Sequence, residues 1–186
     1  MMNAEEYLKK LQEREPQLFP EPLRKSTLTD KDLLEIEKAL GYQLPEQYKE
    51  FLQSYQLLDM TVSLSEDAEF YIEWHNISGV NATEWLGQLK ESDVCVCDDD
   101  AFREAGYLYL GAVSDGHFVL YDLVDGTVGR IYHEEVFDMF YECGIENFEG
   151  GAPEKLREYF EDYFDVFADD FYDFLDFVCL GYQNDN

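Results

Sequence analysis

Side chains that could serve as a catalytic base or nucleophile are scarce in this sequence of 186 residues. It has three histidines, His75, His117 and His133, and a catalytic Ser, Cys or Thr needs such a base beside it. Ser114-Asp115-Gly116-His117 brings a hydroxyl, a carboxylate and an imidazole together, but its place between two expected strands favours a turn. No Gly-x-Ser-x-Gly elbow and no glycine-rich phosphate loop occurs. We therefore expect a protein that is not an enzyme.

Three short stretches contain residue types that bind metals. Cys95-x-Cys97 lacks the Cys-x-x-Cys spacing of zinc and redox sites, and both side chains would lie on one face of a strand as small core residues. Asp98-Asp99-Asp100 clusters the oxygens that calcium prefers, but without the spaced acidic loop and later Glu. His133-Glu134-Glu135 lacks the second helical His of a zinc protease and fits a strand end. We expect no metal and no cofactor.

Charge is the outstanding feature of the composition. The 42 Asp and Glu residues face 13 Lys and Arg residues, so the net charge is 13 − 42 = −29. Such a field repels nucleic acid and anionic membranes and attracts basic partners. Solubility or adaptation to salt is the alternative explanation. The chain is also 46% hydrophobic and 16% aromatic, which argues against a disordered acidic protein.

The cysteines and the hydropathy profile bear on the compartment. There are four cysteines, which form no convincing disulfide framework, and no apolar run approaches the roughly 18 residues of a membrane span. Residues 1–14 alternate in charge and lack the apolar centre of a signal peptide. We expect a cytoplasmic protein with reduced thiols that does not bind membranes.

Helix signals dominate the N-terminal third. Ala4 to Arg14 is expected to form a short amphipathic helix, followed by a proline-rich connector. Thr29 is a suitable N-cap for a helix that ends at Gly41, where glycine tolerates a left-handed conformation. Pro45 fits the first turn of the next helix. These signals predict a compact helical hairpin.

A meander of three strands is the clearest pattern in the middle of the chain. Tyr107 to Val113, His117 to Leu123 and Thr127 to Tyr132 are rich in aromatic and β-branched residues. Asp125-Gly126 between the last two segments is typical of a hairpin with a type I′ turn. We expect an antiparallel sheet here.

The remaining segments complete the expected fold. Short strands are expected at Thr61 to Ser65, Glu69 to Trp74 and Val94 to Cys97, with a helix at Ala82 to Lys90. Apolar residues three or four apart predict that Pro153 to Leu180 is mostly helical, with a break near Ala168. The fold class is then α+β, a single domain with a twisted, mainly antiparallel sheet flanked by helices. Its expected divisions are an N-terminal helix and connector (1–27), the domain itself (28–180) and a tail (181–186).

Three blocks of the chain carry a recognisable combination of motifs. The first block is Leu40-Gly41-Tyr42-Gln43-Leu44-Pro45 with Tyr48 and Phe51-Leu52 behind it. The second is Phe118-Val119-Leu120-Tyr121-Asp122-Leu123, and the third is Phe171-Tyr172-Asp173-Phe174-Leu175. Together they resemble the SUKH superfamily, the Smi/Knr group of fungal cell-wall synthesis regulators and bacterial immunity proteins. Three features depart from the family pattern. The usual Asn-Gly turn is replaced by Gln56-Leu57-Leu58-Asp59, and a Gly-Asp is replaced by Gly116-His117. An acidic helix is added at Pro153 to Val166. The resemblance implies this fold over about Leu28 to Val178, and a partner-binding role.

Three hypotheses about function follow. The resemblance implies an immunity protein that neutralises a toxin, and the charge suggests a basic, nuclease-type target. The alternative is a regulatory interaction module for cell-wall synthesis or signalling. A third hypothesis is a ligand or catalytic cleft around Trp74, Trp85, His117 and His133. For the first, the predicted contacts are acidic residues near aromatic ones, although a solvated surface is the more common explanation of each: Asp98, Asp99, Asp100, Glu161, Asp162, Asp165, Asp169 and Asp173.

Overall fold

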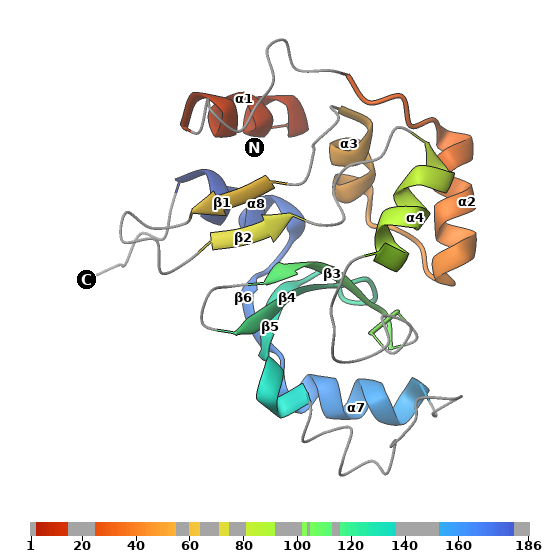
Figure 1. The fold of residues 1–186 in the computed structure, drawn as a ribbon, viewed down its shortest axis with the longest axis vertical. Coiled ribbons are helices and arrows are strands. Elements are labelled where there is room, and N and C mark those ends of the chain that lie inside the picture. Colours follow the sequence, from red (N-terminus) through yellow and green to blue (C-terminus); the bar gives the residue numbers. More distant parts are fainter. Residues whose placement is uncertain are drawn as a thin grey trace.

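A central antiparallel sheet with helices on both faces forms the body of the molecule (Figure 1). The computed structural model describes residues 3–14, 25–54, 60–63, 71–74, 81–91, 102–103, 105–112, 116–136 and 153–180. Helix α7 lies on one side of the sheet in Figure 1, and α2, α3 and α8 lie on the other. The expected α+β class is confirmed.

The helical hairpin near the N-terminus forms as its capping residues predict. It consists of α2 (Asp30–Leu40) and α3 (Glu46–Ser54), and it follows α1 (Ala4–Arg14). Thr29 and Asp32 form a reciprocal capping box at the start of α2, which satisfies backbone N–H groups that a helix start leaves free. Gly41 ends α2 with a φ of 79°, a left-handed conformation that glycine adopts without strain. Pro45 immediately precedes α3 rather than opening it.

The predicted meander is the core of a larger sheet. Strands β3 (Tyr107–Ala112), β4 (His117–Asp122) and β5 (Val128–Tyr132) pair in sequence order, and the full order is β3-β4-β5-β6. A separate antiparallel pair, β1 (Met60–Ser63) and β2 (Tyr71–Trp74), lies next to β3. Helix α4 (Ala82–Glu91) packs on α2. The expected strand at Val94 to Cys97 lies outside the described residues.

The connection between β4 and β5 is longer than the expected two-residue turn. Its ends meet where the N–H of Asp122 donates to the carbonyl of Thr127, and the N–H of Gly126 donates back to the carbonyl of Asp122 over 2.8 Å. The carboxylate of Asp122 accepts two more bonds, from the N–H groups of Val124 and Asp125. This side chain stabilises a wider loop, in which Gly126 takes the positive φ of 77°.

The C-terminal region corrects the helix predicted for Pro153 to Val166. Helix α7 ends at Tyr163, and Asp165–Ala168 is a strand, β6, before α8 (Phe171–Leu180) begins. Strand β6 pairs antiparallel with β5, with a bulge between Val128 and Gly129. The hydrogen bonds that β5 offers along its outer side outweigh the helical spacing of the local sequence. The break near Ala168 is confirmed.

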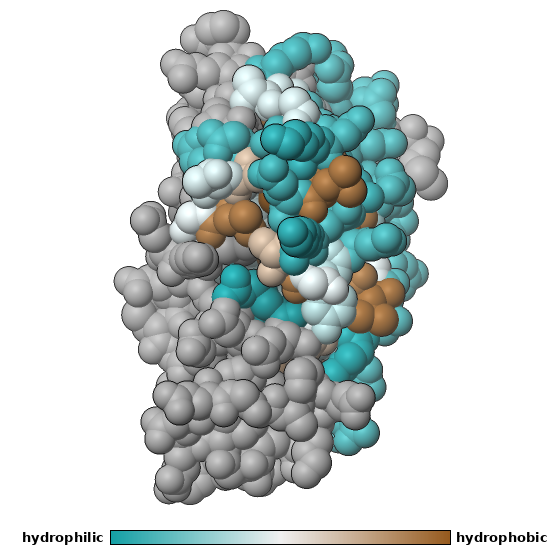
Figure 2. Space-filling model, turned by 90° about the vertical axis from the view of Figure 1, so that its right-hand side faces the viewer, coloured by the Kyte–Doolittle hydropathy of each residue, from teal (hydrophilic) through white to brown (hydrophobic). Residues whose placement is uncertain are grey.

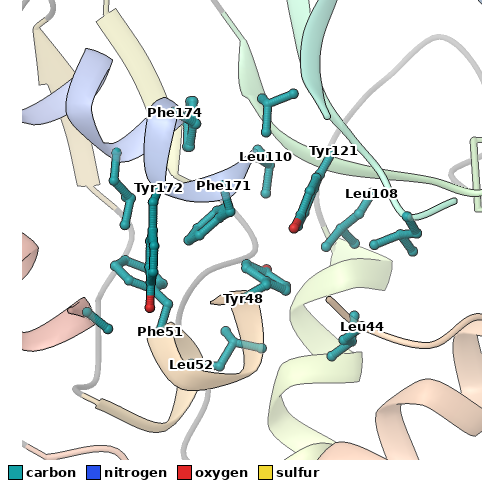
Figure 3. Packing of buried hydrophobic residues seen from close by; sticks show 14 of the residues in the cluster. Leu44, Tyr48, Phe51, Leu52, Leu108, Leu110, Tyr121, Phe171, Tyr172 and Phe174 are labelled. Carbon is teal, nitrogen blue, oxygen red and sulfur yellow. The ribbon is translucent and has the colours of Figure 1, made fainter. Parts of the chain in front are cut away.

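Two apolar clusters cover the two faces of the sheet. The larger one lies under α1, α2, α3 and α8, with the ring of Phe171 at its centre, 4.9 Å from Tyr48 and 5.1 Å from Phe51 (Figure 3). The smaller one lies under α7, where the Phe160 ring is 5.3 Å from that of Tyr107. Helix α7 is thus packed against its own face of the sheet and is an integral layer of the fold.

Candidate protein-binding site

Five of the acidic residues predicted as contacts follow one another along the C-terminal region. They occupy the end of α7, strand β6, the turn after it and the first turn of α8: Glu161, Asp162, Asp165, Asp169 and Asp173. All five are exposed. The other three, Asp98, Asp99 and Asp100, lie outside the described residues. These five exposed residues follow one another along the chain, and we call them the C-terminal strip.

A buried ion-pair network anchors α7, and with it the start of the strip. Arg157 of α7 donates to both carboxylate oxygens of Asp122, over 3.2 and 2.9 Å, and its guanidinium lies 5.2 Å from the centre of the Tyr107 ring. Asp122 is the one fully buried charged residue among those described, at 2% exposure. Burial alone would lower the pKa of Arg157, but the hydrogen bond and charge of Asp122 outweigh it and raise that pKa. The pair ties α7 to the β4–β5 loop.

Pairing distinguishes the strip's residues from one another. Glu161 lies 3.0 Å from the Nε of Arg157, and Asp165 lies 3.0 Å from the Nε of Arg130 on β5. Asp162, Asp169 and Asp173 have no ion pair within the described part of the chain. Part of the strip's charge is therefore neutralised internally, and these three residues carry the charge that is open to a partner.

The N-terminus of α8 concentrates further acids. Asp170 caps the helix, because its carboxylate accepts hydrogen bonds from the N–H groups of Tyr172 and Asp173 over 2.8 and 3.0 Å. Partial burial, together with the charges of Asp170, Asp169 and Asp176, raises the pKa of Asp173. These acids repel one another in the free protein, so a cation placed beside them would relieve that repulsion.

Exposed apolar side chains adjoin the strip. Tyr163 at the end of α7 is 39% exposed and Val166 on β6 is 45% exposed. Two other large apolar residues, Leu34 and Val124, are exposed elsewhere. On the face that carries α2 and α4, hydrophobic residues form brown patches separated by polar ones (Figure 2). Tyr163 directly follows Asp162, and Val166 directly follows Asp165.

The four residues of the third hypothesis come from different elements of the structure. Trp85 is completely buried in the larger core cluster. His117 and His133 lie at one end of the sheet, where Nδ1 of His133 is 2.9 Å from the carbonyl oxygen of Gly116. Trp74 ends β2, and its side chain lies outside what the structure describes. Within the described residues, no group of three or more His, Cys, Asp or Glu side chains is arranged to hold a metal ion.

Sequence reasoning missed two features of this region. It did not identify the Asp122–Arg157 pair, because the two residues are 35 positions apart and neither marks the other in the sequence. It also missed Val166 and Tyr163, because an exposed apolar residue in a predicted amphipathic helix is indistinguishable from a buried one. Assigning β6 as a strand is what places Val166 on the surface.

Comparison with known proteins identifies the family. Searches of curated proteins and of solved structures found no match. No helix among the described residues is long and apolar enough to cross a membrane. The family model of the SMI1/KNR4 family (SUKH-1) matches residues 27–177, which include α2, the whole four-stranded sheet and most of α8. The expected resemblance is confirmed, and the chain belongs to the SMI1/KNR4 family (SUKH-1).

Proposed function

We propose that this protein is an immunity protein that binds a basic, nuclease-type toxin and neutralises it by covering its nucleic-acid site. Family membership supports an interaction domain of the immunity or cell-wall-related kind. The observation that carries the choice between these is the net charge of −29 on a folded domain. Carboxylates on a rigid surface resemble the spaced phosphates that a nuclease binds.

Several of the few basic side chains are paired with acids within the molecule. Lys49 bridges Glu37 and Glu46 at 2.9 Å each, Arg130 pairs with Asp165, and Arg157 pairs with Asp122. Two exposed lysines, Lys25 and Lys31, are likewise paired with acids. In the described chain these ion pairs leave a large surplus of exposed carboxylates. The partner that such a surface accepts with least desolvation cost is a positively charged protein.

A field of this kind also suits the speed that toxin capture demands. Electrostatic steering raises association rate constants to roughly 10⁸–10⁹ M⁻¹s⁻¹ at low salt. Rim charges then set the rate of encounter, and a small number of apolar or aromatic anchors set the lifetime of the complex. Binding should therefore be fast, and its rate should fall steeply with salt.

The experiment is capture of the partner from the source cell, or with the product of the adjacent gene, followed by purification and an activity assay. Recovery of one basic protein whose nuclease activity is abolished at a stoichiometric ratio would support the proposal. An unrelated acidic protein of similar pI serves as control and should inhibit at most weakly. Recovery of cell-wall synthesis or signalling proteins, with no toxicity when the gene is deleted, would refute it.

A further inference from the structure

We propose that helix α1 acts as a ligand of its own chain, docked on a surface that α3 and α8 form. Two properties follow: α1 leaves this surface without unfolding of the sheet, and a basic amphipathic helix of a partner can take its place. The inference does not rest on the proposed function. Helix α1 lies outside residues 27–177, which match the family model. Proteins that recognise helices bind an apolar stripe of side chains three and four positions apart.

Helix α1 contacts the rest of the molecule through such a stripe. Tyr7 and Leu8 follow Ala4 by three and four positions, and the three residues are 3%, 0% and 5% exposed. They join the larger core cluster, and α1 packs on both α3 and α8 (Figure 1). The Tyr7 ring stacks on the Tyr172 ring of α8, with the ring centres 5.3 Å apart and the planes inclined by 28°. This is how an amphipathic helix binds a separate protein.

The surface under α1 is held together by contacts that do not involve α1. Tyr172 extends from α8 toward α3, where its hydroxyl donates to the carboxylate of Glu50 over 2.6 Å (Figure 3). Gln47 of α3 donates to Asp170, the cap of α8, over 3.1 Å. The Phe171 ring of α8 packs against aromatic rings of α3 in the core. These links fix α3 and α8 relative to each other, so the surface loses little conformational entropy when a helix docks.

Helix α1, in turn, depends on docking for its stability. An isolated helix of 11 residues is marginal in water. Its start is capped locally, because the N–H of Glu6 donates to the side chain of Asn3 and the N–H of Asn3 donates back to Glu6, each over 3.0 Å. The ion pair of Lys25 with Glu5 spans 3.5 Å between exposed side chains and contributes little. An element held in this way is among the first to open locally.

Charge favours a basic helix over α1 itself. Helix α1 carries three basic and three acidic side chains, which cancel as 3 − 3 = 0: Lys9, Lys10 and Arg14 with Glu5, Glu6 and Glu13. The net charge of −29 therefore resides on the other residues of the chain. A helix with the same apolar stripe and more Lys or Arg on its outer side is attracted by that field, whereas neutral α1 is not. The occupant is thus defined by chemistry: a basic amphipathic helix with an aromatic residue followed by leucine, as in Tyr7-Leu8.

The first test is amide hydrogen exchange of the full wild-type chain, followed by NMR in increasing urea. The amides of residues 8–14 should exchange at least about tenfold faster than those of β4, since opening of α1 leaves the sheet intact. Their exchange should also depend weakly on urea, because undocking exposes little surface. Exchange of α1 and β4 at the same rate and with the same dependence on urea would overturn the proposal, because α1 would then open only when the whole chain unfolds.

The second test supplies α1 as a separate peptide. Residues 15–24 connect α1 to the domain, and a connector of this length keeps α1 at an effective concentration on the order of millimolar, so a free peptide competes poorly in the wild type. Leu8→Glu places a carboxylate in the buried stripe and should release α1, whereas Leu34→Glu makes the same change at a leucine that is 65% exposed and is the control. By fluorescence anisotropy, a labelled peptide of residues 1–16 should bind the Leu8→Glu chain at least about tenfold more tightly than the wild type or the control. The same peptide carrying Leu8→Glu should not bind.

Charge and cooperativity complete the test. A peptide with Glu13→Lys, at an exposed position near the end of α1, should bind the Leu8→Glu chain about threefold or more tightly than the natural peptide, and salt should reduce the difference. Equal affinities at low salt would refute the preference for a basic helix. If the Leu8→Glu chain lost its cooperative urea unfolding, or bound the peptide no better than the Leu34→Glu control, α1 would be an integral layer of the fold and the proposal would fall.

Discussion

The buried pair between Asp122 and Arg157 allows a quantitative test of how α7 is held. We consider Arg157→Met, which keeps an apolar stem of similar length over the Tyr107 ring and removes the guanidinium. The change leaves the carboxylate of Asp122, only 3% exposed as a side chain, without its bidentate partner. It also removes the hydrogen bond from Arg157 to the carbonyl of Ala105. Asp122 keeps the two N–H donors of its own loop.

The magnitude follows from this partial loss. Removing one partner of a buried pair costs about 3–5 kcal/mol, and the two remaining N–H donors place Arg157→Met at about 3 kcal/mol. In a chain of this size that corresponds to a fall in Tm of roughly 6–12 °C. Asp122→Asn should cost less, about 1–2 kcal/mol, because Arg157 is 20% exposed and retains Asp125 and Glu161 as partners.

The assay is urea unfolding at neutral pH, followed by far-UV circular dichroism, on both single variants and the double variant. A coupling free energy of about 1–3 kcal/mol is expected, since the two side chains are in direct contact. Glu161→Gln, which removes only an exposed partner of Arg157, is the control and should change stability by less than about 0.5 kcal/mol. The reasoning would be refuted if Arg157→Met stayed within about 1 kcal/mol of wild type, or if Asp122→Asn proved the more damaging change.

Three further changes test the core, the backbone and the acidic strip. Phe171→Ala should cost about 3–5 kcal/mol in urea unfolding, because its ring is central to the larger apolar cluster. Gly129→Ala should cost about 1–3 kcal/mol, since a Cβ would meet the Phe164 ring at 2.6 Å, whereas Gly87→Ala on α4 meets no atom within 4 Å and should stabilise by about 0.5–1 kcal/mol. Asp173→Asn should stabilise at pH 7, where burial and the neighbouring acids raise the pKa of Asp173 and its ionised form opposes folding. That gain should vanish as the pH falls below the ordinary range of Asp, where the carboxyl is protonated in both states, and stability curves against pH check it.

Each of these has a result that would contradict it. A Phe171→Ala variant as stable as wild type would mean that the cluster repacks without a cavity. Equal effects of Gly129→Ala and Gly87→Ala would show that contact with Phe164 does not restrict the backbone. An Asp173→Asn variant that loses stability at pH 7 would mean that the favourable interaction of Asp173 with the α8 dipole exceeds the repulsion from its neighbours.

Local rules of backbone chemistry were sufficient for much of the fold. Thr29 and Gly41 predicted both ends of α2, because capping depends on residues within one turn of each other. Asp125-Gly126 predicted the hairpin between β4 and β5 for the same reason. The greater length of that loop was missed, although the Asp122 carboxylate that stabilises it accepts hydrogen bonds from residues only two and three positions away.

Strand β6 shows where local reasoning fails. Its residues continue the apolar spacing of α7, so the sequence favours a longer helix. Its actual partner is β5, and Arg130 and Asp165 are 35 residues apart in the chain. Pairing energy between distant segments has no signature in either segment alone. The strand β6 therefore became visible only once the two segments were placed together.

For the acidic residues, the sequence determines the net charge, whereas the tertiary structure determines what each carboxylate does. Net charge sums over residues independently of conformation, so the excess of carboxylates and the preference for a basic partner follow from composition alone. The role of each carboxylate, in contrast, depends on its surroundings in the folded protein. Asp122 is buried against Arg157, Asp165 is tied to Arg130, and Asp162 faces solvent, because burial and pairing depend on which distant segments meet.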